Sequence, residues 1–290
     1  MRKSPQSTVK LQVAVLGPLG TYTHEAAFAK FGTQADYNEQ QTIAGVFHAL
    51  SETIPLGVVP QENSIFGNVI ETYDALQHAG FVRGEITLKV QHCLLVRKGV
   101  KMDDIQKIMS HEQALGQCQD FIADKFPAAL TEKMPSTASA ARALLENPPN
   151  CAAICSKICA HIFEGLEVLR EGIQKEALNF TRFYIITRSQ NTPTPPLLLM
   201  TCSRTALLRL TAPLHSARHG TLLSHLNSLQ LNVIRIDRRP LANSISFHDM
   251  YYVEIRGNSD GNEDSWVLVV NTALQRVRSS GGEVDLAGIW

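Results

Sequence analysis

Short apolar runs that end in polar turns and lead into helices recur along the first two thirds of this chain. The first run covers residues 11–16 and is followed by a Gly-Pro-Leu-Gly-Thr turn and an amphipathic segment at 24–31. A second run at 56–59 passes through a Pro-Gln-Glu-Asn-Ser turn into a segment at 70–78. Strands that alternate with helices favour an α/β fold, because the helices then cover the faces of a sheet.

The same pattern returns further along the chain. Residues 105–109 and 151–155 predict two more strands, the first followed by a helix through residue 126. Before them, residues 85–96 alternate between apolar and polar and predict either a long strand or a crossing segment. Ligands in open α/β sheets bind at the carboxyl ends of strands, so the polar turns are candidate ligand sites. Each turn taken alone is more typical of a helix cap.

The last third of the chain predicts a separate domain. Residues 189–203 are rich in proline and polar residues and indicate a linker. The order strand, helix, strand, strand, helix after it is typical of a ferredoxin-like domain at 204–280. Small sheets of this kind expose an edge strand, which often pairs across a dimer.

The charge balance argues against two classes of partner. Lys plus Arg equals Asp plus Glu at 27 each, so no basic field indicates nucleic-acid or membrane-surface binding. No apolar run reaches the ~18 residues of a membrane span, and residues 1–10 lack an apolar signal core. We therefore expect a cytoplasmic protein.

Three cysteines recur every four residues at Cys151, Cys155 and Cys159. This spacing could place them along one helix face, as metal ligands or as small buried apolar residues. A metal site would need more ligands nearby, so we expect no metal.

A hydroxyl and a guanidinium stand side by side at Thr181 and Arg182, before a strand-like run at 183–187. Arg presents a planar fork of donors that matches a carboxylate, and Thr presents one short, stiff donor. Together with the four polar turns at residues 17–21, 62–64, 110–113 and 136–138, this pair predicts a cleft for a small dicarboxylate.

Five sequence blocks in order resemble the prephenate dehydratase family, over residues 11–277. They are Gly17-Pro18-Leu19-Gly20-Thr21, residues 57–64 with Gly67, Ser110-His111 with residues 113–115 and 117–118, Ser136-Thr137-Ala138, and Asn179 with Thr181-Arg182-Phe183. Phe66 stands where the family often has a polar residue. The C-terminal part resembles an ACT regulatory domain, with Asp237 and Arg238 in place of a Glu-Ser pair.

The resemblance implies a fold with two parts. An α/β catalytic domain at 11–188 would have two lobes like a periplasmic binding protein, with lobe 1 at about 11–85 and 178–188 and lobe 2 at about 86–177. A linker at 189–203 would lead to a ferredoxin-like (βαββαβ) ACT domain at 204–280.

The resemblance also implies an activity, the conversion of prephenate to phenylpyruvate in phenylalanine biosynthesis, without a cofactor or metal. Thr181 would act on the departing hydroxyl, and Arg182 would bind a carboxylate. The remaining substrate-binding candidates are Thr21, Glu62, Asn63, Ser64, Ser110, Gln113, Ser136, Thr137 and Phe183.

Phenylalanine would be the allosteric effector of a homodimer or homotetramer. The candidate effector residues are Gly220, Thr221, Leu222, Asn232, Arg239 and Pro240. The Asp237-Arg238 departure leaves the strength and identity of this control open.

Two other functions fit the same residues. An arogenate dehydratase would act on the aminated substrate, and a non-catalytic amino-acid sensor would only bind. A fused chorismate mutase domain is not expected, because about ten residues precede the first strand.

Overall fold

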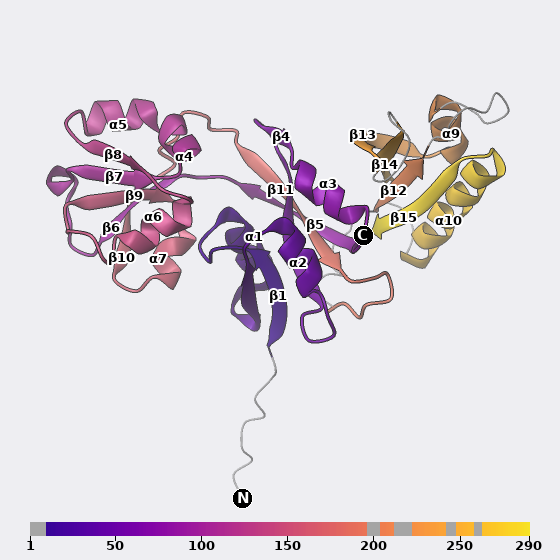
Figure 1. Cartoon of the computed structure of the whole chain (residues 1–290), viewed down its shortest axis with the longest axis horizontal. Coiled ribbons are helices and arrows are strands. Elements are labelled where there is room, and N and C mark those ends of the chain that lie inside the picture. Colours follow the sequence, from indigo (N-terminus) through magenta and orange to yellow (C-terminus); the bar gives the residue numbers. More distant parts are fainter. Residues whose placement is uncertain (1–9, 196–203, 212–221, 242–247, 258–262) are drawn as a thin grey trace, which may run out of the picture. The chain divides into compact units, whose positions relative to one another are not determined.

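The computed structural model describes residues 10–195, 204–211, 222–241, 248–257 and 263–290 (Figure 1). The chain divides into a first unit of residues 1–69 and 86–183 and a second unit of residues 70–85 and 184–290. Strands β5 (Phe81–Lys89) and β11 (Phe180–Thr187) run through both units, because both boundaries fall inside them. These boundaries differ from the predicted domain limits, which stay predictions.

The first sheet of the first unit is built around β1 (Leu11–Leu16). It pairs in parallel with β2 (Ala35–Gln40) and with β3 (Leu56–Asn63). Because parallel strands are covered on both faces, they read as continuous apolar runs, and β1 is such a run. Helices α1 (Tyr22–Phe31) and α2 (Ile43–Ala49) pack against it, and Thr42 caps α2 by accepting from the Gly45 amide at 2.9 Å.

The second sheet of the first unit is sandwiched between helices. Its strand order is β10 (Leu166–Glu171), β6 (Cys93–Arg97), β9 (Cys151–Cys155), β7 (Lys107–Ser110) and β8 (Leu130–Lys133). Figure 1 shows α4 (Glu112–Gln117) and α5 (Gln119–Lys125) on one side of this sheet. Helices α6 (Thr137–Ala143) and α7 (Ile158–Ile162) lie on the other.

Strand β6 shows why this sheet is stable. Cys93 and Leu95 pack into the core beneath α6, whereas Leu94 and Val96 pack into the core beneath α4 and α5. Side chains alternate between the faces of a strand, so four consecutive apolar residues serve two cores. Burying one such leucine stabilises the fold by roughly 1.5–3 kcal/mol.

In the first unit one element prediction was wrong, and two open alternatives are decided. The crossing segment at 85–96 is not one strand, because β5 and β6 belong to different sheets. Between them the Gln174 side chain bonds the His92 amide and the Val90 carbonyl, which satisfies the backbone without a strand partner. The helix expected through residue 126 breaks at Cys118, whose φ of −106° is not helical. Cys151 and Cys155 lie on β9 and Cys159 on α7, so they share no helix face.

The second unit has the predicted βαββαβ order. It contains β12 (Thr205–Thr211), α9 (Leu222–Leu229), β13 (Asn232–Pro240), β14 (Asp249–Arg256), α10 (Glu263–Ser279) and β15 (Glu283–Ile289). The antiparallel sheet has the order β13-β14-β12-β15, and Trp266, Val270 and Val277 of α10 pack into its core. The predicted α/β class is confirmed, and β15 extends past residue 280.

Helix α3 (Ile70–Leu76) also belongs to the second unit. The Arg239 guanidinium donates to both carboxylate oxygens of Asp74 at 2.8 Å. The Tyr73 hydroxyl donates to Asp237 at 2.8 Å, and the Tyr252 hydroxyl donates to the Tyr73 carbonyl at 2.8 Å. Polar contacts thus bind α3 to β13 and β14.

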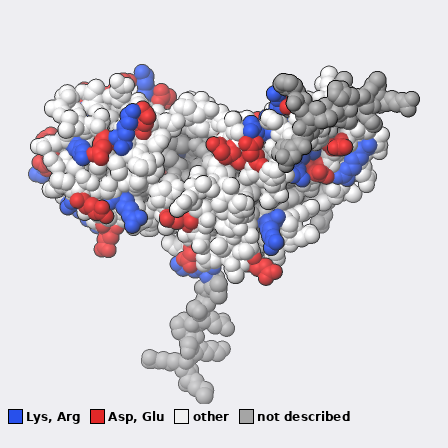
Figure 2. Space-filling view, viewed as in Figure 1, with Lys and Arg blue, Asp and Glu red and all other residues white. Residues whose placement is uncertain are grey.

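Charged side chains of both signs are interspersed on the visible face of the lobe that carries α4 to α7 (Figure 2). This agrees with the equal numbers of basic and acidic residues in the chain. In the described part of the chain, no helix is long and apolar enough to cross a membrane.

Candidate functional site

A pocket of ≈ 440 Å³ lies within the first unit, where the turns after several strands meet. None of the described residues that line it is Asp, Glu, Lys or Arg. Its wall includes seven of the eleven predicted catalytic and substrate-binding residues: Thr21, Asn63, Gln113, Ser136, Thr137, Thr181 and Phe183.

The first residues of three helices lie on the pocket wall. Thr21 caps α1, and its hydroxyl also donates to the Leu16 carbonyl at 2.7 Å. His111 caps α4 by accepting from the Gln113 amide, and Ser136 caps α6 by accepting from the Ser139 amide at 3.0 Å. The cap interpretation of these turns is therefore correct, and the caps also bring helix N-termini to the pocket.

The start of α1 is fixed by two features of the glycine turn. Gly20 has a φ of 102°, a conformation that glycine adopts without strain, and a Cβ there would lie 2.8 Å from Cys159 Sγ. The Gly20 amide donates to His24 Nδ1 at 3.1 Å. Burial of His24 lowers its pKa to about 4, so its ring stays neutral and can accept this bond.

Asn63 organises the side of the pocket that carries Thr181. Its Oδ1 accepts from the Ile65 and Phe66 amides at 2.9 and 3.1 Å, in the turn between β3 and β4 (Gly67–Asn68). This fixes its Nδ2 toward Asn179 Oδ1 at 2.7 Å and Thr181 Oγ1 at 2.9 Å. No described residue accepts a hydrogen bond from the Thr181 hydroxyl, so its proton can be donated into the pocket.

The structure does not bring Arg182 to the pocket wall. Successive side chains on a strand point to opposite faces, and Thr181 and Phe183 of β11 are the ones that line the pocket. Arg182 lies near Glu62, with 3.7 Å between guanidinium nitrogen and carboxylate oxygen. Glu62 is likewise absent from the wall of the pocket as described.

Two predicted serines also lie outside the described pocket wall, in structural positions. Ser110 is fully buried, and its hydroxyl donates to the Ile154 carbonyl of the neighbouring strand β9. The Ser64 hydroxyl donates to the Leu178 carbonyl at 3.2 Å and accepts from the Phe180 amide at 2.9 Å. Both hydroxyls therefore hold the backbone around the site.

Tyr22, His92 and Gln117 are among the side chains on the pocket wall that sequence reasoning did not predict as site residues. The Tyr22 hydroxyl lies 2.6 Å from His92 Nδ1, and His92 Nε2 is hydrogen bonded to Gln117 Oε1. Burial lowers the pKa of His92, and it raises the pKa of Tyr22 well above its usual value. A histidine directly before the apolar run 93–96 is a signal that could have found this group.

The described residues contain no group of three or more His, Cys, Asp or Glu side chains able to hold a metal ion. Cys151, Cys155 and Cys159 are buried free thiols. Cys93 and Cys118 are buried as well, and burial raises the pKa of each thiol to about 12, so neither is a reactive thiolate at neutral pH.

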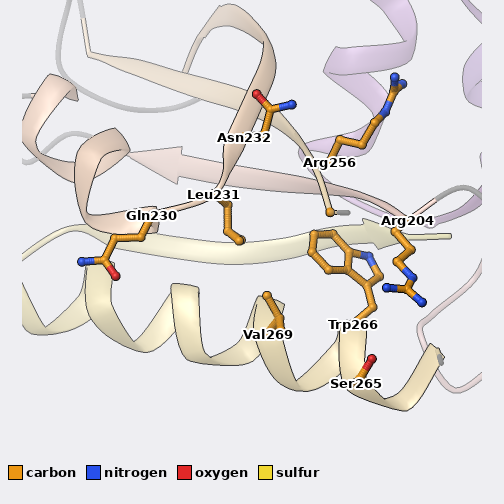
Figure 3. A pocket seen from close by; sticks show the side chains of 9 residues that line it. Arg204, Gln230, Leu231, Asn232, Arg256, Ser265, Trp266 and Val269 are labelled. Carbon is orange, nitrogen blue, oxygen red and sulfur yellow. The ribbon is translucent and has the colours of Figure 1, made fainter. Parts of the chain in front are cut away.

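A second pocket, of ≈ 320 Å³, lies within the second unit (Figure 3). Trp266 of α10 stands between Arg204 and Leu231 in this view, and Arg256 comes from the end of β14. Of the predicted effector residues within the described chain, Asn232 alone lines it. Gly220 and Thr221 lie outside the described residues.

The sequence matches known proteins along most of its length. The sequence model of a family described as prephenate dehydratase matches residues 13–191. A bifunctional chorismate mutase/prephenate dehydratase of Neisseria gonorrhoeae is 29% identical over 283 residues, which are 97% of this chain and 74% of the relative. The protein with the same description from Pseudomonas aeruginosa is 37% identical over 186 residues, which are 63% of this chain and 50% of the relative.

Solved structures agree with these matches. The crystal structure of a prephenate dehydratase from Arthrobacter aurescens in complex with L-Phe is 26% identical, with a TM-score of 0.75, and the match covers 96% of this chain and 89% of that chain. A prephenate dehydratase from Staphylococcus aureus shares the fold, with 24% identity, a TM-score of 0.73 and coverage of 97% and 100%.

Proposed function

Because the chain belongs to the prephenate dehydratase family, we propose that the pocket of the first unit is where prephenate loses carbon dioxide and water. The family match confirms the predicted resemblance and the class of enzyme, a lyase that forms phenylpyruvate. Which residues do this, and how the enzyme is regulated, are proposals.

The reaction explains why a pocket whose described wall has no Asp, Glu, Lys or Arg side chain suffices. Prephenate is a dianion whose ring becomes aromatic when the ring carboxylate leaves as carbon dioxide and the hydroxyl leaves as water. The products are carbon dioxide, water and the phenylpyruvate anion, so the dianion takes up one proton. The driving force lies in the substrate, and the protein has to orient it and assist the departing hydroxyl.

Thr181 is the residue that we assign to the departing hydroxyl, and one observation carries this assignment. Asn63 donates to Thr181 Oγ1 at 2.9 Å, so the hydroxyl oxygen is held in place while its proton faces the pocket. A preoriented donor aimed at developing charge lowers a barrier by about 2.7–4 kcal/mol in well-studied cases. A threonine hydroxyl is a weak acid, so it stabilises the departing group as a hydrogen-bond donor.

For the substrate carboxylates we propose a different partner from the predicted Arg182, because Arg182 does not line the described pocket. The N-terminal residues of α1, α4 and α6 all line the pocket, and helix N-termini favour negative charge. The side chains of Gln113 and Thr137 can add hydrogen bonds there. We therefore assign carboxylate binding to this wall.

Ultraviolet detection of phenylpyruvate from purified protein and prephenate tests the function. We expect Thr181→Val to lower kcat at least about a hundredfold, because the donor is lost while the shape is kept. The melting temperature should change little. A normal kcat in this variant would contradict the role of Thr181, and faster turnover of arogenate than of prephenate would reassign the substrate.

We also propose that the second unit is an ACT domain that binds phenylalanine. Its βαββαβ order supports this, as does the relative from Arthrobacter aurescens that was crystallised with L-Phe. Asn232 and Pro240 mark the two ends of β13, and Leu222 begins α9. Inhibition by phenylalanine, measured with the same assay, tests this proposal. Equal turnover with and without millimolar phenylalanine would contradict it.

The sheet of the second unit supports a homo-oligomer. Strand β13 stands at the end of the strand order, and its Ile234 and Ile236 are 37% and 44% exposed. An edge strand with exposed apolar side chains is suited to pairing with a second copy.

A cytoplasmic location fits a biosynthetic enzyme and stays a proposal.

A further inference from the structure

Three side chains on the pocket wall form one continuous row of hydrogen bonds. Tyr22 comes from the start of α1, His92 from the crossing between β5 and β6, and Gln117 from the end of α4. The Tyr22 hydroxyl lies 2.6 Å from His92 Nδ1, and His92 Nε2 bonds Gln117 Oε1. All three line the pocket that contains Thr181.

The middle member of this row is held rigidly. The His92 amide donates to Gln174 Oε1 at 2.9 Å, and its carbonyl accepts from the Ile173 amide at 3.1 Å. Its ring meets the Tyr22 ring edge-on, with 5.7 Å between the centroids, and only 3% of His92 is exposed. A side chain fixed in this way can orient its neighbours without moving itself.

The row has a defined direction, because the partner of Nε2 can only accept. Gln117 Oε1 is a carbonyl oxygen, so His92 Nε2 carries the hydrogen and donates it. The neutral ring then has a lone pair at Nδ1, which accepts the hydroxyl proton of Tyr22. The lowered pKa of His92 and the raised pKa of Tyr22 agree with two neutral groups at neutral pH.

This direction decides what each end of the row offers to a substrate. The Tyr22 hydroxyl has two acceptors, His92 Nδ1 at 2.6 Å and the Gln91 carbonyl at 3.3 Å, and the shorter contact places its only proton on the His92 side, so its oxygen presents lone pairs to the pocket. Gln117 has engaged its carbonyl oxygen, so its amide nitrogen is left to donate. The wall thus holds one acceptor and one donor of fixed type.

We propose that His92 is a positioning residue for the dehydration, which holds Tyr22 as acceptor for the substrate hydroxyl and Gln117 as donor to a substrate carboxylate. The departing hydroxyl would then receive a hydrogen bond from Thr181 and give one to Tyr22. This inference rests on the proposed function of the pocket, and it assigns no proton transfer to His92.

Kinetics of three variants test the proposal. We expect His92→Phe, which keeps a ring and removes both hydrogen bonds, to lower kcat/KM at least about thirtyfold. His92→Asn keeps an acceptor near Tyr22 and should recover kcat at least about threefold over His92→Phe. Tyr37→Phe is the matched control, since it removes a partly buried hydroxyl that donates to the Gly32 carbonyl at 2.7 Å, outside the pocket wall. It should keep kcat within about twofold of the wild type.

The coupling between Tyr22 and His92 separates positioning from mere structural support. Tyr22→Phe should lower kcat about tenfold in the wild type, and less than about threefold in the His92→Phe background. Equal factors in both backgrounds would overturn the proposal, and so would a normal kcat/KM in His92→Phe.

The nitrogen-15 spectrum of histidine-labelled wild-type protein tests the row without any variant or turnover. We expect His92 as the neutral tautomer protonated at Nε2. Protonation at Nδ1, or at both nitrogens at neutral pH, would overturn the proposal. Absence of phenylpyruvate formation by the wild type would instead defeat the proposed function, and the spectrum would still report on the row.

Discussion

At the scale of single residues, the orientation of the Asn63 side-chain amide sets the hydrogen bonding of the Thr181 hydroxyl. The side-chain oxygen of Asn63 accepts hydrogen bonds from two backbone amides. Its side-chain nitrogen donates to Thr181, Asn179 and the Phe180 carbonyl. Only an amide can do both from one position. The rotamer of the Thr181 hydroxyl is therefore set by a residue on another strand.

Replacing this amide by a carboxylate should redirect the hydroxyl. In Asn63→Asp the new oxygen accepts the Thr181 proton, so the donor no longer faces the substrate. We expect kcat for phenylpyruvate formation to fall at least about thirtyfold, with a loss of about 1–3 kcal/mol in unfolding free energy in urea. Asn150→Asp is the control, because Asn150 donates to Gln106 on the exposed surface. Unimpaired turnover in Asn63→Asp would refute this role of the amide.

The predicted carboxylate clamp makes a second residue-scale prediction. Arg182 lies beside Glu62, on the strand face opposite Thr181. If this placement governs function, Arg182→Lys should change the KM for prephenate less than about threefold, because no bidentate contact with the substrate is lost. Steady-state kinetics decide the matter, and a KM increase of tenfold or more would restore Arg182 to substrate binding.

The difference between Thr181 and Arg182 also shows what a sequence can predict at this scale. Motif order brought Thr181, Asn63 and Ser136 correctly to one pocket. It could not tell which face of β11 lies at the pocket, because both faces of that strand carry polar or aromatic residues. Tyr22 and His92 were missed because the contact between them joins residues that are 70 positions apart in the sequence.

At the scale of elements, the turn between β1 and α1 carries much of the site. The Gly20 amide donates to His24 Nδ1, and His24 is 2% exposed among aromatic neighbours. Burial lowers its pKa to about 4. The unfolded chain therefore binds a proton at His24 near pH 6.5, whereas the folded chain binds it only near pH 4.

The difference in proton binding at His24 between the unfolded and the folded chain fixes the direction in which stability changes with pH. Between pH 6.5 and 4 the unfolded state holds more protons, so the stability contributed by the neutral ring is present above pH 6.5 and is lost as the pH falls. From pH 7 to pH 5 we expect the loss from His24 to be about 2 kcal/mol. Urea unfolding of wild type and His24→Asn at both pH values measures it. Between the two pH values, the unfolding free energy of the variant should fall by about 2 kcal/mol less than that of the wild type. Equal losses in both proteins would contradict the assignment.

The elements that sequence patterns missed share a physical cause. Strand β2 has the sequence Ala-Asp-Tyr-Asn-Glu-Gln, and all four residues of β8 are exposed. Edge strands carry few apolar side chains, so neither strand shows a periodic signal, and pairing with β1 or β7 creates them. The central strands β1 and β9 are short apolar runs and were predicted with correct bounds.

At the scale of the whole molecule, helix α3 follows a pocket-lining segment in the sequence and is itself part of the second unit. The chain runs from Phe66 on the pocket wall through β4 directly into α3. Within the second unit, Arg239 pairs with both oxygens of Asp74, and the Arg209 guanidinium donates to the Leu76 and Gln77 carbonyls. A structural change at β13 would therefore be transmitted to α3, and along the chain to the turn residues that hold Asn63.

Removing the ion pair should weaken control more than catalysis. In Asp74→Asn the bidentate contact with Arg239 loses its charge partner, so the proposed binding of phenylalanine at the second unit should affect α3 less. Useful allosteric coupling is typically ~1–3 kcal/mol, so losing half of it should raise the phenylalanine concentration for half inhibition about threefold or more. Uninhibited kcat should stay within about twofold, because Asp74 is outside the described pocket wall. Asp36→Asn, which weakens an exposed ion pair with Lys10 in the first unit, is the matched control and should leave inhibition unchanged. An unaltered inhibition curve in Asp74→Asn would show that the signal travels by another route than α3.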